Sequence, residues 1–158
     1  MQMVLRPARA DEAGALSSLA LRSKAQWGYD MPFLDACRPA LTFDPGELGA
    51  RRAVLAEDDS GQVLGFYTLE GTPPVAELAN LWIEPAHMRR GVGRRLWEHA
   101  MTTAAALGCT AVTIDADPYA EGFYLAMRAE RIGAVPSTAV AGRLLPQLRY
   151  RLANDLPA

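Results

Sequence analysis

The segment Met88–Arg95 places two glycines among four arginines, where the hydrophobic pattern indicates that a helix begins. A helix start offers unpaired backbone N–H groups and a partial positive charge, and Gly91 and Gly93 carry no side chain that would keep a ligand away from them. Arginine side chains add donors that suit phosphate oxygens. The segment therefore predicts a pyrophosphate-binding turn. Its expected contact residues are Met88, Arg89, Arg90, Gly91, Val92, Gly93 and Arg94.

Two other glycine-rich phosphate loops are excluded by the residues that follow Gly93. The loop of nucleotide hydrolases needs a lysine and then serine or threonine there, whereas this chain has Arg94 and Arg95. A dinucleotide-binding fingerprint needs a small residue three positions after Gly93, and that position holds Leu96. A solvated face of arginines is the simplest alternative, and the glycines at the helix start argue against it.

The stretch Val75–Leu96 resembles the signature of the GCN5-related N-acetyltransferases (GNAT family), whose turn reads Pro-x-x-Arg/Gln-x-x-Gly-x-Gly/Ala. Pro85, Gly91 and Gly93 fill their places in that pattern, while Met88 takes the place of the Arg or Gln. The backbone amides of the turn remain available whatever the side chain at this position.

A second segment, Asp117–Ser137, resembles the downstream motif of the same family. The acidic residue at its start, Ala120 and the aromatic pair 123–124 stand at the family's positions. Arg128 replaces the glycine that usually follows this helix, which leaves open a displaced turn with Gly133 as its substitute. Two motifs in the right order, with a strand between them, make the resemblance specific.

The resemblance implies the α+β acyl-CoA N-acyltransferase fold, as a single domain over residues 1–153 with residues 154–158 as a frayed tail. In that fold a mixed, mostly antiparallel central sheet is flanked by helices, and its fourth and fifth strands splay apart. The slot between them binds the pantetheine arm of acetyl-CoA, and no metal is involved. The further cofactor-binding residues that the resemblance implies are Leu81, Trp82, Ile83, Asp117, Ala120 and Tyr124.

Acetyl transfer to an amine requires a neutral amine, an oxyanion donor and a proton for the departing thiolate. The motif places Tyr124 at the coenzyme sulfur as the acid; the alternative is a core tyrosine whose hydroxyl bonds to the backbone. Strand alternation puts Glu77 on one face with Leu81 and Ile83, where burial would raise its pKa and make it the base. The alternative is a carboxylate exposed at a strand edge. A backbone N–H within 81–83 is the expected oxyanion donor.

The acceptor side of the fold is formed by the first two helices and the late loop 140–143. Trp27 and Tyr29 are candidate substrate-binding residues, although they serve equally well as packing between helices and sheet. The acceptor is an amine of a small molecule or a peptide, and the sequence does not identify it. His87 and His99 are not expected to be catalytic, since one lies in the phosphate turn and the other on a helix.

The elements that position these residues follow from hydrophobic periodicity and from turn residues. The order is strand, two helices, three strands, helix, strand, helix and two strands, an α+β pattern. Gly108 is expected to end the long helix in a left-handed conformation. The expected strands are Met3–Pro7, Arg52–Glu57, Gln62–Glu70, Val75–Ile83, Ala111–Asp115, Ile132–Val135 and about Leu148–Leu152. The expected helices begin near Asp11, Pro32, Gly91 and Asp117.

The composition describes a globular chain of 158 residues with a net charge of −2, which argues against nucleic-acid binding. Neither a signal peptide nor an 18-residue apolar run is present, so a soluble, cytoplasmic protein without membrane contact is expected. Cys37 and Cys109 form neither a disulfide nor a metal pattern. The expected partners are acetyl-CoA and an amine acceptor. The sequence leaves open whether the protein is a homodimer.

Two functions therefore stand against each other. The first is an acetyl-CoA-dependent N-acetyltransferase that works by direct attack in a ternary complex. The alternative is a non-catalytic acyl-CoA-binding sensor module on the same fold, suggested by Met88 and Arg128 at positions where the family differs.

Overall fold

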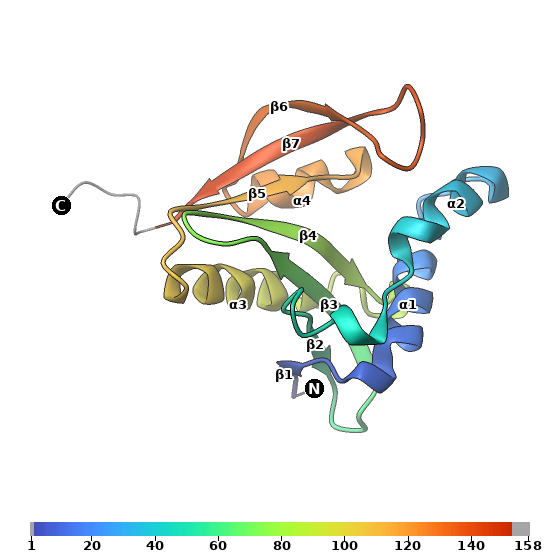
Figure 1. Cartoon of the computed structure of the whole chain (residues 1–158). Coiled ribbons are helices and arrows are strands. Elements are labelled where there is room, and N and C mark those ends of the chain that lie inside the picture. Colours follow the sequence, from blue (N-terminus) through green and yellow to red (C-terminus); the bar gives the residue numbers. More distant parts are fainter. Residues whose placement is uncertain (1, 153–158) are drawn as a thin grey trace.

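Residues 2–152, the part of the chain that the computed structural model describes, form a seven-stranded sheet with helices on both faces (Figure 1). The strands are β1 (Val4–Pro7), β2 (Val54–Glu57), β3 (Val63–Glu70), β4 (Val75–Ile83), β5 (Ala111–Asp115), β6 (Glu130–Pro136) and β7 (Leu144–Arg151). The helices are α1 (Ala13–Ala25), α2 (Met31–Cys37), α3 (Val92–Ala106) and α4 (Glu121–Ala126). This order confirms the order expected from the sequence. The predicted tail at 154–158 lies outside the described residues.

The strand order is β1-β2-β3-β4-β5-β7-β6. All neighbouring strands run antiparallel except β4 and β5, which run parallel. The sheet is therefore mixed and mostly antiparallel, as predicted. Among residues 2–152, no helix has the length and apolar character that crossing a membrane requires.

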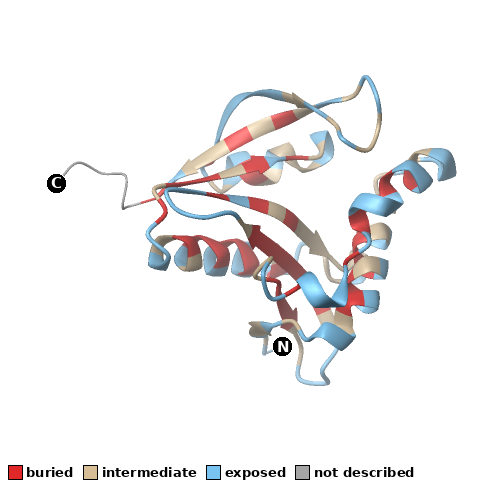
Figure 2. Ribbon diagram, viewed as in Figure 1, coloured by how far each residue is buried: buried red, intermediate tan, exposed pale blue. Residues whose placement is uncertain are grey.

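One hydrophobic core lies between the sheet and the pair α3 and α4. Helix α3 buries Val92, Leu96, Ala100 and Ala104, which recur at helical spacing and face β3 and β4. The second core lies on the opposite face, where α1 and its neighbours pack onto Phe66. Figure 2 shows the buried positions on the strands and on the sheet-facing sides of α1 and α3. The sheet is thus covered on both faces, and any site must open at its edges or gaps.

The pairing between β4 and β5 is short. Only Val75–Glu77 of β4 pair with Ala111–Thr113 of β5, yet β4 continues to Ile83. Beyond Glu77 the two strands separate, and the edge of β4 that faces β5 has no strand partner there. This gap confirms the predicted splay between the fourth and fifth strands.

A β-bulge in β4 changes which side chains share a face. Thr68 pairs with Asn80 while the next residue of β3 pairs with Leu78, so one residue of β4 is inserted in the ladder. Leu78 and Leu81 therefore both pack into the core beside α3, and Glu77 points to the other face. The expectation that Glu77 shares a face with Leu81 is wrong, because strict alternation does not survive the extra residue.

Two turns with a left-handed residue end the helices α3 and α4. Gly108 adopts φ +92° after α3, which confirms its predicted role as a left-handed helix end. Arg128 itself adopts φ +73° after α4, so the turn is not displaced and Gly133 does not replace it. The N–H of Ala129 then donates to the carbonyl of Tyr124 over 3.0 Å. An arginine thus takes the backbone conformation that glycine adopts at lower cost.

Several strand boundaries differ from the sequence prediction. β1 and β3 each begin one residue later than expected, and β6 is longer than expected, from Glu130 to Pro136. β2 begins at Val54 rather than Arg52, because Arg52 turns the chain with φ +48°. β7 begins at Leu144 rather than Leu148, and it includes Pro146, a residue type that is uncommon within strands. In the sheet the Pro146 carbonyl accepts the N–H of Ala116 over 2.9 Å, so the proline belongs to the strand region.

Candidate active site

The turn between β4 and α3 presents a run of free backbone donors. Gly91 precedes the helix in a left-handed conformation with φ +84°, and Arg89 adopts φ +62°. Within the described structure, the backbone N–H groups of residues 89–94 donate to no protein acceptor. A Cβ on Gly91 would meet no heavy atom within 4 Å, so the space above the turn is open. Such a turn binds anions through its amides and the helix dipole.

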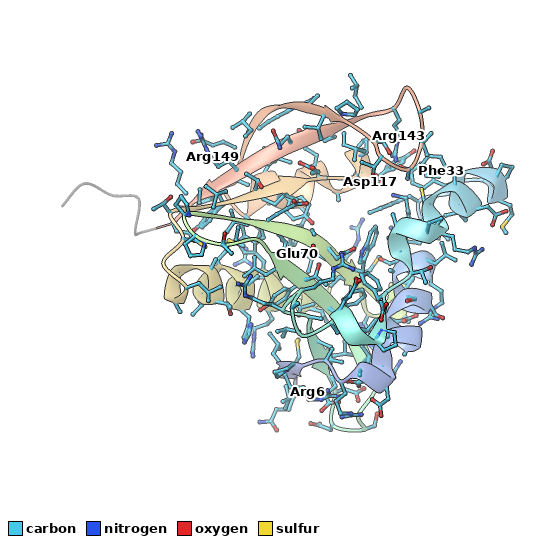
Figure 3. All side chains as sticks on the ribbon, in the orientation of Figure 1. Arg6, Phe33, Glu70, Asp117, Arg143 and Arg149 are labelled. Atoms are coloured by element: carbon cyan, nitrogen blue, oxygen red, sulfur yellow. The ribbon has the colours of Figure 1, made fainter. Side chains whose placement is uncertain are left out.

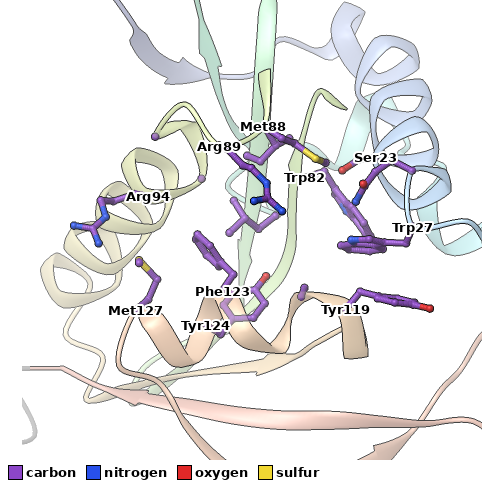
Figure 4. Close-up of a pocket in the computed structure, with 16 residues that line it drawn as sticks. Ser23, Trp27, Trp82, Met88, Arg89, Arg94, Tyr119, Phe123, Tyr124 and Met127 are labelled. Carbon is purple, nitrogen blue, oxygen red and sulfur yellow. The ribbon is translucent and has the colours of Figure 1, made fainter. Parts of the chain in front are cut away.

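The turn opens into a cavity of about 350 Å³ between β4, α1, α3 and α4, called here the β4–α4 cavity. Figure 4 shows side chains from these elements converging on it. The predicted residues that line it are Trp27, Leu81, Trp82, Ile83, Met88, Arg89, Gly91, Gly93, Arg94, Ala120 and Tyr124. Most of the expected cofactor residues are thus brought together in one place.

Several predicted residues lie elsewhere. The Val92 side chain is buried in the core, so only its backbone N–H faces the turn. Arg90 is exposed and does not line the β4–α4 cavity. Asp117, Glu77 and Tyr29 lie outside this cavity as well. The expectation of cofactor contacts from the Asp117 side chain therefore has no support in its position.

Sequence reasoning missed five residues that line the β4–α4 cavity. Phe123 packs against the core and also lines the cavity, and its ring stands 3.2 Å from the position of a Cβ on Gly93, so a side chain there would press on the ring. Tyr119 and Met127 belong to the second motif segment, and that membership was an available signal. Ser23 and Gln26 flank the predicted Trp27 on α1, and only that proximity pointed to them.

Tyr124 combines burial with a free hydroxyl. The residue is 6% exposed, and its ring packs against Phe123 and Trp97 with centroids 5.2 and 5.8 Å away. Its hydroxyl has no hydrogen-bond partner in residues 2–152 and points into the cavity in Figure 4. Burial, together with the negative charge of Asp117, raises the pKa of Tyr124. The tyrosine therefore keeps its proton at neutral pH and can donate it.

A second hollow, of about 250 Å³, lies on the α1–α2 side of the sheet and is called here the β4–β7 groove. It runs between the splayed strands and the loop that joins β6 to β7. Its lining includes Lys24, Cys37, Arg51, Glu77, Asn80, Trp82, Asp115, Asp117, Ser137 and Arg143. Trp82 lines both hollows, so the two lie on either side of one indole ring.

Glu77 lies in the β4–β7 groove without a hydrogen-bond or ion-pair partner in the described chain. Desolvation raises the pKa of Glu77, the carboxylates of Asp115 and Glu70 raise it further, and Arg51 opposes them. The residue is exposed at the groove wall, which matches the alternative of an accessible strand carboxylate. A carboxylate with a raised pKa on an open groove can accept a proton from a ligand.

Asp117 ties four elements together. It accepts the N–H of Tyr119 over 2.9 Å and so orders the turn between β5 and α4. Lys24 donates to it over 3.1 Å, and the Tyr29 hydroxyl lies 3.0 Å from each carboxylate oxygen. Arg143 donates to Tyr29 over 2.6 Å and to Asp117 over 3.3 Å. Arg143 and Asp117 are labelled in Figure 3. The predicted acceptor residue Tyr29 thus belongs to a polar network.

The same network sets two pKa values. Burial alone would raise the pKa of Asp117, yet the Tyr119 N–H and Lys24 outweigh it and lower that pKa. Burial and the Asp117 charge raise the pKa of Tyr29. Asp117 is therefore ionised and Tyr29 protonated at neutral pH.

Trp27, the other predicted acceptor residue, stacks on Tyr119 with centroids 5.8 Å apart and leans on Trp82 at 6.2 Å. It lines the β4–α4 cavity, so it closes the end of that cavity next to α1. Tyr29, although close to Trp27 in sequence, lines neither hollow and reaches the β4–β7 groove only through its bonds to Asp117 and Arg143.

The two histidines lie outside both hollows. His99 bonds through Nδ1 to the Tyr67 hydroxyl over 2.7 Å, and neither His99 nor His87 lines a hollow. Cys37 and Cys109 are buried thiols. No group of His, Cys, Asp and Glu within residues 2–152 is arranged to hold a metal ion.

Comparisons of the sequence with known proteins identify the family. The model of the acetyltransferase (GNAT) family matches residues 18–127. Mycothiol acetyltransferase from Streptomyces bingchenggensis is 45% identical over 49 residues, a stretch that spans 30% of this chain and only 16% of that relative.

Solved structures agree in fold over almost the whole chain. A GCN5-related N-acetyltransferase from Rhodopseudomonas palustris has a TM-score of 0.79 at 21% identity, over 96% of this chain and 97% of that one. PaiA N-acetyltransferase from Thermoplasma acidophilum, solved with coenzyme A, has a TM-score of 0.75 at 16% identity, over 96% and 99%. With a family model that matches more than half of its residues, the chain belongs to the GNAT family of acetyltransferases.

Proposed function

We propose that this protein transfers the acetyl group of acetyl-CoA to a primary amine by direct attack in a ternary complex. One observation carries the proposal: the free N–H groups of residues 89–94 open into the cavity where the Tyr124 hydroxyl stands without a partner. A coenzyme held by its phosphates at that turn would extend its thioester toward a buried acid. Family membership supports the same chemistry.

Binding of the coenzyme is divided between backbone and side chains. The free amides of residues 89–94 would hold the pyrophosphate, and Arg89 and Arg94 at the cavity wall add positive charge. The unpaired edge of β4 beyond Glu77 would bond the amides of the pantetheine arm. The coenzyme A complex of the Thermoplasma acidophilum neighbour supports a coenzyme of this kind.

The proposed reaction needs proton transfers at the attacking amine, through Glu77, and at the departing sulfur, through Tyr124. The amine first loses one proton through Glu77 to solvent, and its nitrogen then bonds to the carbonyl carbon. The C–S bond breaks as Tyr124 gives its proton to the sulfur. The second amine proton restores the Tyr124 hydroxyl. A backbone N–H within 81–83 would stabilise the oxyanion.

The test measures binding and turnover separately on the purified full chain. Release of CoA from acetyl-CoA is followed with a panel of amines, amino acids, polyamines and peptides, while melting curves report coenzyme binding. We expect a raised Tm with acetyl-CoA and turnover with at least one amine. A raised Tm without turnover on any acceptor would contradict the proposal and favour a sensor module.

A further inference from the structure

The β4–β7 groove carries opposite charges at its two ends. The end next to the paired part of β4 and β5 holds Glu77 and Asp115, and Glu70 lies beside them. Arg51 is the cation there, and it is bonded to Glu70 over 2.9 and 3.0 Å. Three carboxylates thus face one guanidinium, which leaves this end negative. An ammonium group is attracted to such a site.

The other end of the groove is positive. Lys24 and Arg143 stand there around the single carboxylate of Asp117, at 3.1 and 3.3 Å. Their side chains are 10% and 18% exposed, so both charges are poorly hydrated. The Lys24 nitrogen lies 5.7 Å from the ring centroids of Phe33 and Trp82, and these aromatic faces stabilise the cation.

Both cations keep donors that nothing else in the described chain uses. Lys24 bonds only to Asp117, although an ammonium carries three N–H groups. Arg143 donates through Nη2 alone, so its Nε and Nη1 groups have no partner in residues 2–152. An ion pair with a purely structural role would need only one cation for the single carboxylate of Asp117. The second cation and the spare donors suit an anionic group of a ligand.

We propose that the acceptor is a small amine that also carries an anionic group, a carboxylate or a phosphate. Its ammonium binds at the Glu77 end of the groove, and its anionic group binds to Lys24 and Arg143. This inference rests on the proposed acetyl transfer and names the substrate class of the same site. The groove volume of about 250 Å³ is below the range typical of drug-sized ligands, which favours a small molecule over a protein segment.

The test compares acceptors that differ only in the anionic group. Amino acids of increasing chain length are assayed beside their neutral amides and their phosphonate analogues, by CoA release at saturating acetyl-CoA. The pH is varied, because the amine pKa differs within a series. We expect kcat/KM for an anionic acceptor to exceed that of its amide by about 10- to 100-fold, the range for hydrogen bonds to a charged group. The comparison of each amino acid with its phosphonate analogue shows whether the site prefers a carboxylate or a phosphate-like group.

Variants separate recognition from fold. Arg143→Gln should bring the preference for the anionic acceptor down to about 3-fold or less, because the charge that binds the anionic group is lost. Arg143→Lys should restore part of the preference. Arg38→Gln is the matched control, since Arg38 is an exposed arginine outside the groove, paired with Asp35. It should keep the full preference.

The outcomes are distinguishable. Turnover of amines with equal rates for acid, phosphonate and amide would overturn the inference and leave the acetyl transfer standing. A preference that survives Arg143→Gln in a variant with the parent's coenzyme-induced rise in Tm would also overturn it. If Arg143→Gln fails to fold, the salt dependence of the parent enzyme still tests the inference. Its preference for the anionic acceptor must fall at high salt, because salt screens Lys24 and Arg143. Coenzyme binding without turnover would instead contradict the proposed function itself.

Discussion

Tyr124 and Glu77 lie on opposite faces of the central sheet. Tyr124 belongs to the core beside α3 and lines the β4–α4 cavity, whereas Glu77 lines the β4–β7 groove on the side of α1 and α2. The strand pairing between β4 and β5 ends at Glu77, and Trp82, which follows on β4, lines the hollows on both sides. The proposed acid and the proposed base therefore approach a reacting carbon in the gap between these strands from two directions, with separate access for coenzyme and acceptor.

Gly91→Glu should abolish coenzyme binding. A side chain there projects into the open space above the free amides, and its negative charge repels phosphate. In the parent, acetyl-CoA at about 100 times its Kd should raise Tm by roughly 5–10 °C. Gly108→Glu is the matched control, since it places the same residue at another open left-handed glycine at the far end of α3. A preserved shift in Gly91→Glu would reject the phosphate turn.

Tyr124→Phe should lower kcat by about 10- to 1,000-fold with little change in acetyl-CoA affinity, because a positioned acid is lost and the phosphate contacts remain. The loss should shrink with an acyl donor whose thiol is more acidic, since that thiolate leaves without help. Tyr150→Phe, which removes a hydroxyl from a ring packed 5.3 Å from Trp97, is the control for packing. Joint loss of stability, affinity and rate would assign Tyr124 to the core alone.

Glu77→Gln should slow acetylation of a lysine-like amine more than that of an α-amino group. At pH 7 an amine of pKa 10.4 needs about 4.6 kcal/mol to become neutral, and one of pKa 7.8 needs only about 1.1 kcal/mol. Initial rates with matched pairs of acceptors measure the difference. Equal slowing of both, or none, would remove Glu77 from the mechanism.

The same variant should also change stability with pH in a defined direction. The pKa of Glu77 is raised in the folded protein, so the folded state binds its proton more tightly than the unfolded state does. Its contribution to stability is therefore greatest at low pH and falls as the pH rises through the raised pKa. Melting curves should show Glu77→Gln gaining stability over the parent at neutral pH and losing that gain near pH 4. A gain that grows toward acid pH would contradict this sign.

Arg128→Gly should stabilise the protein by about 1 kcal/mol and raise Tm by roughly 2–4 °C, because glycine adopts φ +73° without a clash at Cβ. Arg128→Ala keeps the Cβ and should show no such gain. If both variants melt alike, the left-handed conformation is not the cause. Thermal unfolding of the three proteins side by side decides between these results.

Much of the fold followed from sequence because its signals are local. Gly91, Gly93 and Gly108 mark the two ends of α3, and the apolar runs mark the strands. The bulge in β4 was not predictable in this way, because the inserted residue shows only in the register of Thr68 and Asn80. One misplaced residue in the alternation was enough to put Glu77 on the wrong face.

Only part of the candidate site was predicted, because only part of it is marked by local sequence signals. The turn residues and Tyr124 were found because they are close in sequence to glycines or motif aromatics. The groove was expected only as the segments that form it, the first helices and the loop 140–143. Its ion pairs were not predicted, since Lys24, Asp117 and Arg143 come from distant parts of the chain and meet only in the folded structure. The signal for them was weak: a lysine within an apolar helix pattern and an arginine in a glycine-marked loop.

The short ladder between β4 and β5 also has a mechanical consequence. With only Val75–Glu77 paired to Ala111–Thr113, the sheet consists of two half-sheets hinged at one end, and a molecule in the gap would brace them together. Amide hydrogen exchange should then show slower deuterium uptake along residues 78–83 when a ligand is bound than when it is absent. The two substrates would then bind cooperatively, since whichever arrives first has already ordered the halves that the second must contact.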